Sequence, residues 1–101
     1  MMLAKSDSGT EHLRDSIAAS NQALLVYSPK NHPMDWSFTK YSIGMALFNL
    51  GLRERSGARL KEAETAFQES LTVLSRDKNP EQWTAGQESL ADLRADLRKF
   101  E

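Results

Sequence analysis

The chain contains few residues of the types that build metal centres. Its only histidines are His12 and His32, and it contains no cysteine. Zinc sites need three or four ligands that converge on one point. The nearest approach to such a set is His12 with Glu11 and Asp15, which includes no second histidine. We therefore predict no metal site, and the lack of cysteine also excludes disulfides and thiolate catalysis.

The serines and acids lack the settings used in covalent catalysis. A serine nucleophile needs a positioned base, and no serine here lies in a glycine-rich segment or a strained strand-to-helix turn. The acid pairs Asp92/Asp96 and Glu62/Glu64 have the spacing of solvated helix faces. No glycine-rich loop suits a phosphate group. The sequence therefore predicts a protein that is not an enzyme, with no catalytic residues and no cofactor.

One basic cluster is a candidate for contact with nucleic acid. It comprises Arg53, Arg55, Arg59 and Lys61. Three glutamates interleave with it, at Glu54, Glu62 and Glu64, and the whole chain has a formal net charge of −1. Phosphate binding needs an excess of positive charge that neighbouring acids do not cancel. We interpret this cluster as a solvated turn, with a nucleic-acid accessory role as the alternative.

Composition and length predict one soluble domain. Of the 101 residues, 40% are hydrophobic and 27% are charged, which is ordinary for a globular protein. The longest apolar runs, 23–27 and 45–48, are far shorter than the roughly 20 residues that cross a bilayer. The first residues also lack the apolar core of a signal peptide. We expect a cytoplasmic protein that does not span a membrane.

Hydrophobic spacing and helix-end signals predict four helices and no strand. Pro33 and Pro80 suit the first position of a helix, where the missing N–H group loses no hydrogen bond. Ser8 and Glu11 have the spacing of a capping box. The predicted helices are at about 9–28, 33–51, 58–75 and 80–100, after a disordered segment at 1–8. The fold class is therefore all-α, with four antiparallel helices stacked in one domain at 9–101.

The second predicted helix is apolar on two sides. One stripe comprises Trp36, Thr39, Ile43, Ala46, Leu47 and Leu50, and the other comprises Phe38, Tyr41, Met45 and Phe48. A helix that is apolar on more than one side packs between neighbours, so this helix is predicted to be the central element. The fourth helix has one apolar seam opposite a charged face, which is typical of an end element. Its seam contains Leu90, Leu93 and Leu97.

The sequence also echoes itself. Pro33-Met34-Asp35-Trp36 returns 47 positions later as Pro80-Glu81-Gln82-Trp83. At the same offset, Leu13, Ala19, Leu24 and Ser28 match Leu60, Ala66, Leu71 and Ser75. A period of this size is typical of stacked helical repeats. These repeats form surfaces for other proteins more often than they form active sites.

The segment 36–71 resembles a tetratricopeptide repeat, in the longer bacterial form that has an extended turn between its helices. Gly44, Ala63 and Phe67 occupy the family's small and aromatic positions. The resemblance implies that first helices line a concave face that binds a protein partner. On this chain the face would also include Phe38, Phe48 and Ala85, and its predicted partner-binding residues are Tyr41, Met45, Asn49, Glu88, Asp92 and Asp96. Such a face suits a peptide or helix with an apolar anchor and basic flanks.

Two points about this surface stay open at the level of sequence. Phe38 and Phe48 share the stripe of Tyr41, and packing against the first or fourth helix is the alternative interpretation for both. Repeat arrays normally need about three repeats, and this chain holds one complete repeat between two half-repeats. We therefore expect a homo-oligomer or a docked protein partner. The alternative function is a structural homo-oligomer through the fourth-helix seam or the exposed end of the first helix, with 52–57 as a hinge for helix exchange.

Overall fold

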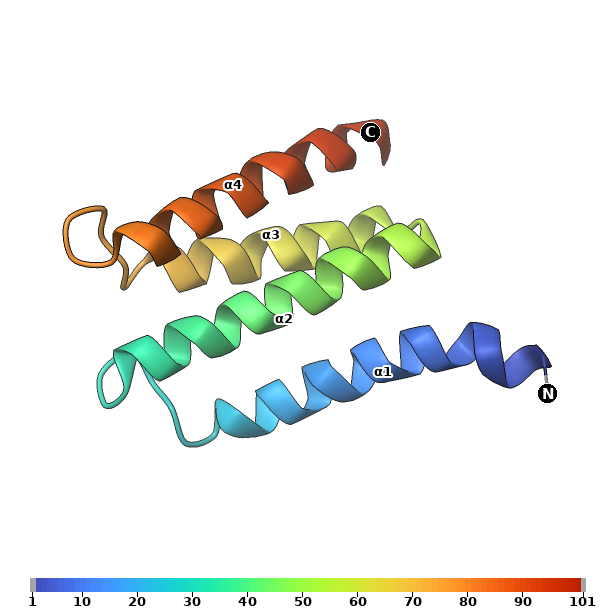
Figure 1. Cartoon of the computed structure of the whole chain (residues 1–101), viewed down its shortest axis with the longest axis horizontal. Coiled ribbons are helices and arrows are strands. Elements are labelled where there is room, and N and C mark those ends of the chain that lie inside the picture. The colour runs from blue at the N-terminus through green and yellow to red at the C-terminus, as the bar shows by residue number, and fades with distance from the viewer. Residues whose placement is uncertain (1, 101) are drawn as a thin grey trace.

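A computed structural model describes the backbone of residues 2–100 and the side chains of residues 10–100. Within this part the chain is helical and has no strand. Figure 1 shows the helices side by side, each antiparallel to the one before it. Their bounds are α1 (Met2–Ala23), α2 (Pro33–Glu54), α3 (Gly57–Leu71) and α4 (Pro80–Leu97), followed by the short 3-10 helix η1 (Arg98–Phe100). The predicted all-α class with four antiparallel helices is confirmed.

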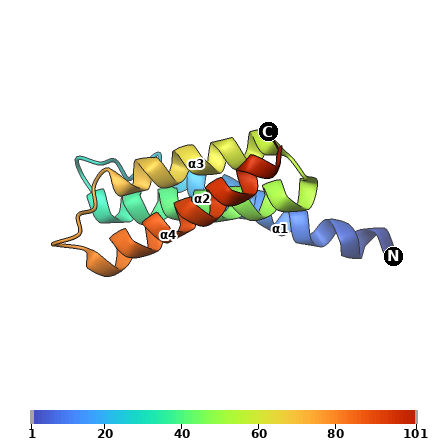
Figure 2. The same cartoon turned by 90° about the horizontal axis from the view of Figure 1, so that it is seen from above.

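The helices form a thin stack in which each packs mainly on its neighbours in the chain. The principal extents are 47 × 31 × 20 Å. In Figure 2, most of α3 lies nearer the top of the picture than α2 and α4. α2 and α4 run in the same direction and together form the layer opposite α3. This packing of consecutive helices is consistent with a helical repeat.

The core lies between α2, α3 and α4. Leu60, Phe67 and Leu93 are fully buried there. Two glycines let α2 approach α3 closely, because a Cβ atom on Gly44 would lie 2.6 Å from ring carbons of Phe67. A Cβ atom on Gly51 would lie 2.8 Å from a methyl carbon of Leu60. Burial of each of these large side chains stabilises the fold by roughly 1.5–3 kcal/mol.

α1 begins and ends earlier than predicted. The helix starts at Met2, so its backbone includes residues 2–8, which were predicted to be disordered. This segment is rich in good helix formers, and the helix continues through the predicted capping box. At the other end, Asn31 directs a turn: its side chain donates to the Val26 carbonyl (3.0 Å) and accepts from the Ser28 amide (2.7 Å). These bonds replace the last helical turn that was predicted.

The connection between the second and third helices is shorter than the predicted 52–57, because α2 continues to Glu54. Arg55 follows in the left-handed conformation, with φ 53° and ψ 49°. The Ser56 amide donates to the Gly51 carbonyl (2.8 Å), and the Ser56 hydroxyl caps α3 by accepting from the Arg59 amide (3.2 Å). The extended turn and the flexible hinge predicted at this place are therefore replaced by a tight turn.

The turns before α2 and α4 repeat the same hydrogen bond. The Ser28 hydroxyl accepts from the Asn31 amide (3.1 Å), and the Ser75 hydroxyl accepts from the Lys78 amide (3.0 Å). Ser28 and Ser75 are matched residues of the sequence echo. The second turn ends α3 at Leu71 rather than at 75, and α4 gives way to η1 after Leu97 rather than continuing to 100. The echo therefore corresponds to a shared local structure.

Candidate partner-binding surface

The exposed face of α2 carries a row of large side chains. Phe38 is 48% exposed and Met45 is 36% exposed, with half-buried Tyr41 between them. Residues spaced by three and four positions lie on one face of a helix. Phe38 is therefore not buried against α1 or α4 in the way that the alternative interpretation predicted. Phe48 does join the core, with its ring edge-on to Phe67 at a centroid distance of 6.5 Å.

Tyr41 connects α2 to α4. Its hydroxyl lies 2.9 Å from the hydroxyl of Ser89 on α4. Its ring lies 5.4 Å from the ring of Phe67, centroid to centroid. Ser89 also contacts the sulfur of Met45 at 4.0 Å. The structure thus places Tyr41 and Met45 together beside α4, and it fixes the Tyr41 ring from two sides.

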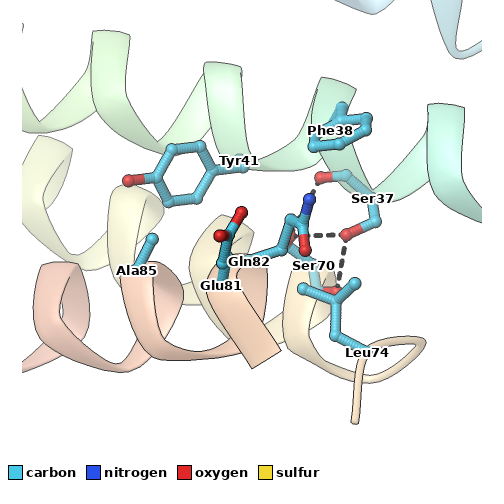
Figure 3. A pocket seen from close by; sticks show the side chains of 8 residues that line it. All are labelled: Ser37, Phe38, Tyr41, Ser70, Leu74, Glu81, Gln82 and Ala85. Atoms are coloured by element: carbon cyan, nitrogen blue, oxygen red, sulfur yellow. Dashed lines mark hydrogen bonds between the residues drawn. The ribbon is translucent and has the colours of Figure 1, made fainter. Parts of the chain in front are cut away.

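A pocket of about 280 Å³ opens between the first halves of α2 and α4. Figure 3 shows its lining side chains, which come from α2, from α4 and from the end of α3 and the turn after it. Most of the exposed lining surface is apolar, although α4 contributes polar groups at one side and two serines contribute them at the floor. The lining residues are Ser37, Phe38, Tyr41, Ser70, Leu74, Glu81, Gln82 and Ala85.

The floor of this pocket is polar but fully hydrogen-bonded. Ser37 donates to the Ser70 carbonyl (3.0 Å), and Ser70 donates to the Ser37 carbonyl (2.9 Å). Their hydroxyl oxygens are 2.9 Å apart, and both residues are buried. No buried side-chain nitrogen or oxygen in the described part of the chain lacks a partner. The floor therefore requires no hydrogen bond from a ligand.

Acidic side chains differ in how they are neutralised. On α2 and α3, Glu54 pairs with Arg14 and Arg59, Glu64 pairs with Arg94 (2.8 Å), and Glu69 pairs with Lys40 (2.8 Å). On α4, Asp96 pairs with Lys99 (3.3 Å). Three other acids of α4 have no basic side-chain nitrogen within 4.0 Å among residues 10–100: Glu81, Glu88 and Asp92.

The six predicted partner-binding residues therefore have different environments. Tyr41 and Met45 meet at Ser89, whereas Asn49 donates to the Met45 carbonyl of its own helix (3.0 Å). Glu88 and Asp92 are exposed and unpaired among the described side chains, and Asp96 is held by Lys99. Sequence reasoning did not assign five of the pocket residues to this surface, namely Ser37, Ser70, Leu74, Glu81 and Gln82. Glu81 and Gln82 were noticed only as part of the echo, although Glu81, Ala85 and Glu88 have the spacing of one helix face.

The two alternative binding surfaces, the α4 seam and the basic turn, are respectively buried and partly neutralised. The Leu90, Leu93 and Leu97 seam of α4 is buried in the core, so the predicted dimer contact through this seam is not accessible in this fold. In the basic turn, Arg59 is paired with Glu54 (3.6 Å) and with Glu62 (3.3 Å). That pairing reduces the positive charge that a phosphate backbone would meet.

Within the described residues, no three histidine or acidic side chains gather closely enough to hold a metal ion. None of the described helices combines the length and the apolar character that crossing a membrane requires. Comparison with known proteins returned no matching family model, no matching curated protein and no matching solved structure.

Proposed function

We propose that this chain is a non-enzymatic interaction module that binds a protein segment over α2 and α4. The observation that carries the proposal is the pocket between these helices, with the half-exposed ring of Phe38 at its edge. Concave, mostly apolar sites with a few polar groups are the usual form of a binding site. Large apolar side chains exposed at such a site mark a place for interaction, because their burial under a partner is favourable.

The helical-repeat architecture supports the same proposal. Gly44 and Phe67 make the close contact between α2 and α3 that the tetratricopeptide resemblance leads us to expect. α2 and α4 then correspond to first helices, and the pocket lies on their shared face. We include membership of that repeat class in the proposal, with the tight turn at Arg55 as a departure from its longer form.

The proposal can be tested by capture of partners from the native cell, with identification by mass spectrometry. The double variant Phe38→Ala/Asp92→Ala should lose the specific partner, because both side chains are exposed on this face. The variant Glu62→Ala/Gln68→Ala is the control, since these residues are exposed on α3. Both variants should keep the helical circular dichroism of the natural chain. Equal capture by all three folded proteins would contradict the proposal.

A second candidate is a structural homo-oligomer formed through the end of α1. Two apolar side chains are conspicuously exposed in the turn that follows this helix, Leu25 at 79% and Val26 at 63%. A dimer that covers them should appear as a doubled mass in sedimentation and should dissociate in the Leu25→Ser/Val26→Ser variant. A natural chain that sediments as a monomer at all concentrations would exclude this candidate.

A further inference from the structure

The apolar row on α2 has a regular spacing. Phe38 and Met45 are seven positions apart, which corresponds to about 10.5 Å along the helix axis. Both side chains are exposed, and Tyr41 fills the space between them. A partner that covers the row must therefore present apolar side chains at about this distance.

α4 carries an acidic row that runs beside the apolar one. Glu81, Glu88 and Asp92 lie on the same face as Ala85, at spacings of three, four and seven positions. Both rows begin at the pocket, since Phe38 and Glu81 line it, and α2 and α4 run in the same direction. The acids of this row have no cation within 4.0 Å among residues 10–100, unlike Glu54, Glu64 and Glu69. Positive charge on a partner would complement them.

The spacing distinguishes a helical partner from an extended one. A helix repeats its side-chain positions every seven residues, which again corresponds to about 10.5 Å. An extended segment covers this distance in about three residues, at roughly 3.3 Å each. Side chains three positions apart in a strand point to opposite faces, so one extended segment cannot present both of them to α2. A helix can cover Phe38 and Met45 from a single face.

We propose that the partner of this surface is an amphipathic helix with a basic flank, docked along α2 and α4. This inference rests on the proposed function and specifies the partner. One apolar side chain of the helix enters the pocket, where the Ser37–Ser70 pair needs no hydrogen bond from it. Its lysine or arginine residues lie over Glu81, Glu88 and Asp92. Docking of an amphipathic helix in a groove is a common mode of recognition.

The test uses the full chain and synthetic labelled helical peptides, with binding measured by fluorescence anisotropy. The first peptide has leucines at heptad-type spacing and lysines on one flank. A second peptide has the same composition in scrambled order, and a third has glutamate in place of each lysine. We expect the first peptide to bind one-to-one, and the other two to bind at least about tenfold more weakly.

Matched variants locate the binding site. Ala85→Arg places a large cation in the pocket and should weaken binding of the first peptide about tenfold or more, whereas Ala95→Arg on the exposed side of α4 should not. Phe38→Ala should also weaken binding, and it is a second probe should Ala85→Arg disturb the fold.

Neutralisation of the acidic row should weaken binding and reduce its salt dependence, in contrast to neutralisation of three exposed acids elsewhere. The two sets are Glu81→Gln/Glu88→Gln/Asp92→Asn and Glu11→Gln/Asp15→Asn/Asp77→Asn.

The outcomes separate this inference from the proposed function. Binding that depends on Phe38 and Ala85 but is as strong for the scrambled or glutamate peptide would overturn the inference and leave the proposed function standing. If no peptide responds to Ala85→Arg or to Phe38→Ala, the site itself is wrong, and both fail. A dimer of the chain that dissociates in Ala85→Arg would show that a second copy occupies the surface, which also overturns the inference.

Discussion

α1 and α3 carry matching residues, yet only α3 lies between two other helices. Leu60 and Ala66 of α3 are buried, whereas their counterparts in α1 are a half-buried Leu13 and an exposed Ala19. α3 packs on α2 and on α4, while α1 packs on α2. The comparison teaches that burial in this chain is decided by how many neighbours a helix has, even where the residues themselves are alike.

The two helices also differ in one residue that lies at the centre of the core. α3 has Phe67 in its centre, and the matching position of α1 is Ser20. The Phe67 ring fills the space over Gly44 and contacts the rings of Tyr41 and Phe48. A serine cannot fill such a space. α3 is thus adapted to two neighbours, and α1 to one.

The largest effect should come from removal of this ring. Phe67→Ala should lower the free energy of unfolding by about 3–5 kcal/mol, because it leaves a cavity between three helices. Ser20→Ala at the matching position should change it by less than about 0.5 kcal/mol. Both values can be measured by urea denaturation followed by circular dichroism. Equal losses at the two positions would refute the difference between α1 and α3.

An intermediate effect is expected at the glycine that faces the ring. Gly44→Ala should lower the free energy of unfolding by about 1–3 kcal/mol, because the new methyl group meets Phe67 at 2.6 Å. Alanine is the better helix former, so propensity alone predicts the opposite sign. The matching residue of α4 is Ala91, which is exposed, and Ala91→Leu should be within about 0.5 kcal/mol of neutral. Stabilisation by Gly44→Ala in thermal unfolding would show that the helices are less tightly packed.

The smallest effect concerns the serine pair below the pocket. Ser37→Ala removes a buried hydrogen bond to Ser70 and should destabilise the fold by about 1 kcal/mol. The matching residue of α4 is Thr84, which is exposed, so Thr84→Ala should have almost no effect on the unfolding midpoint. A destabilisation by Thr84→Ala as large as that by Ser37→Ala would mean that the outer face of α4 is covered.

Much of the fold could be predicted from sequence, because helix-end signals and hydrophobic spacing act locally. Pro33 and Pro80 begin their helices as predicted. The second helix, however, does not end at Gly51, where its predicted range ended. In the structure Gly51 lies within α2 and allows the approach of Leu60. A glycine selected for close packing and a glycine selected for a turn look the same in one sequence.

The candidate site was only half predictable for a related reason. Tyr41 and Met45 belong to a stripe that helical periodicity reveals. The pocket, however, also needs Ser70 and Leu74, which reach it only because the end of α3 and the turn after it lie against α2 and α4. Such a meeting of three elements depends on tertiary packing, and no spacing within one helix encodes it.

The neighbour-by-neighbour packing of the helices also bears on how the chain folds and opens. Contacts between consecutive helices are close in sequence, and chains dominated by such contacts fold quickly. α1, held on one side, should detach while α2, α3 and α4 remain together, since local openings begin where few apolar contacts must be broken. The amide hydrogens of α1 should therefore exchange with solvent sooner than those of α3, as separate stages of one unfolding process.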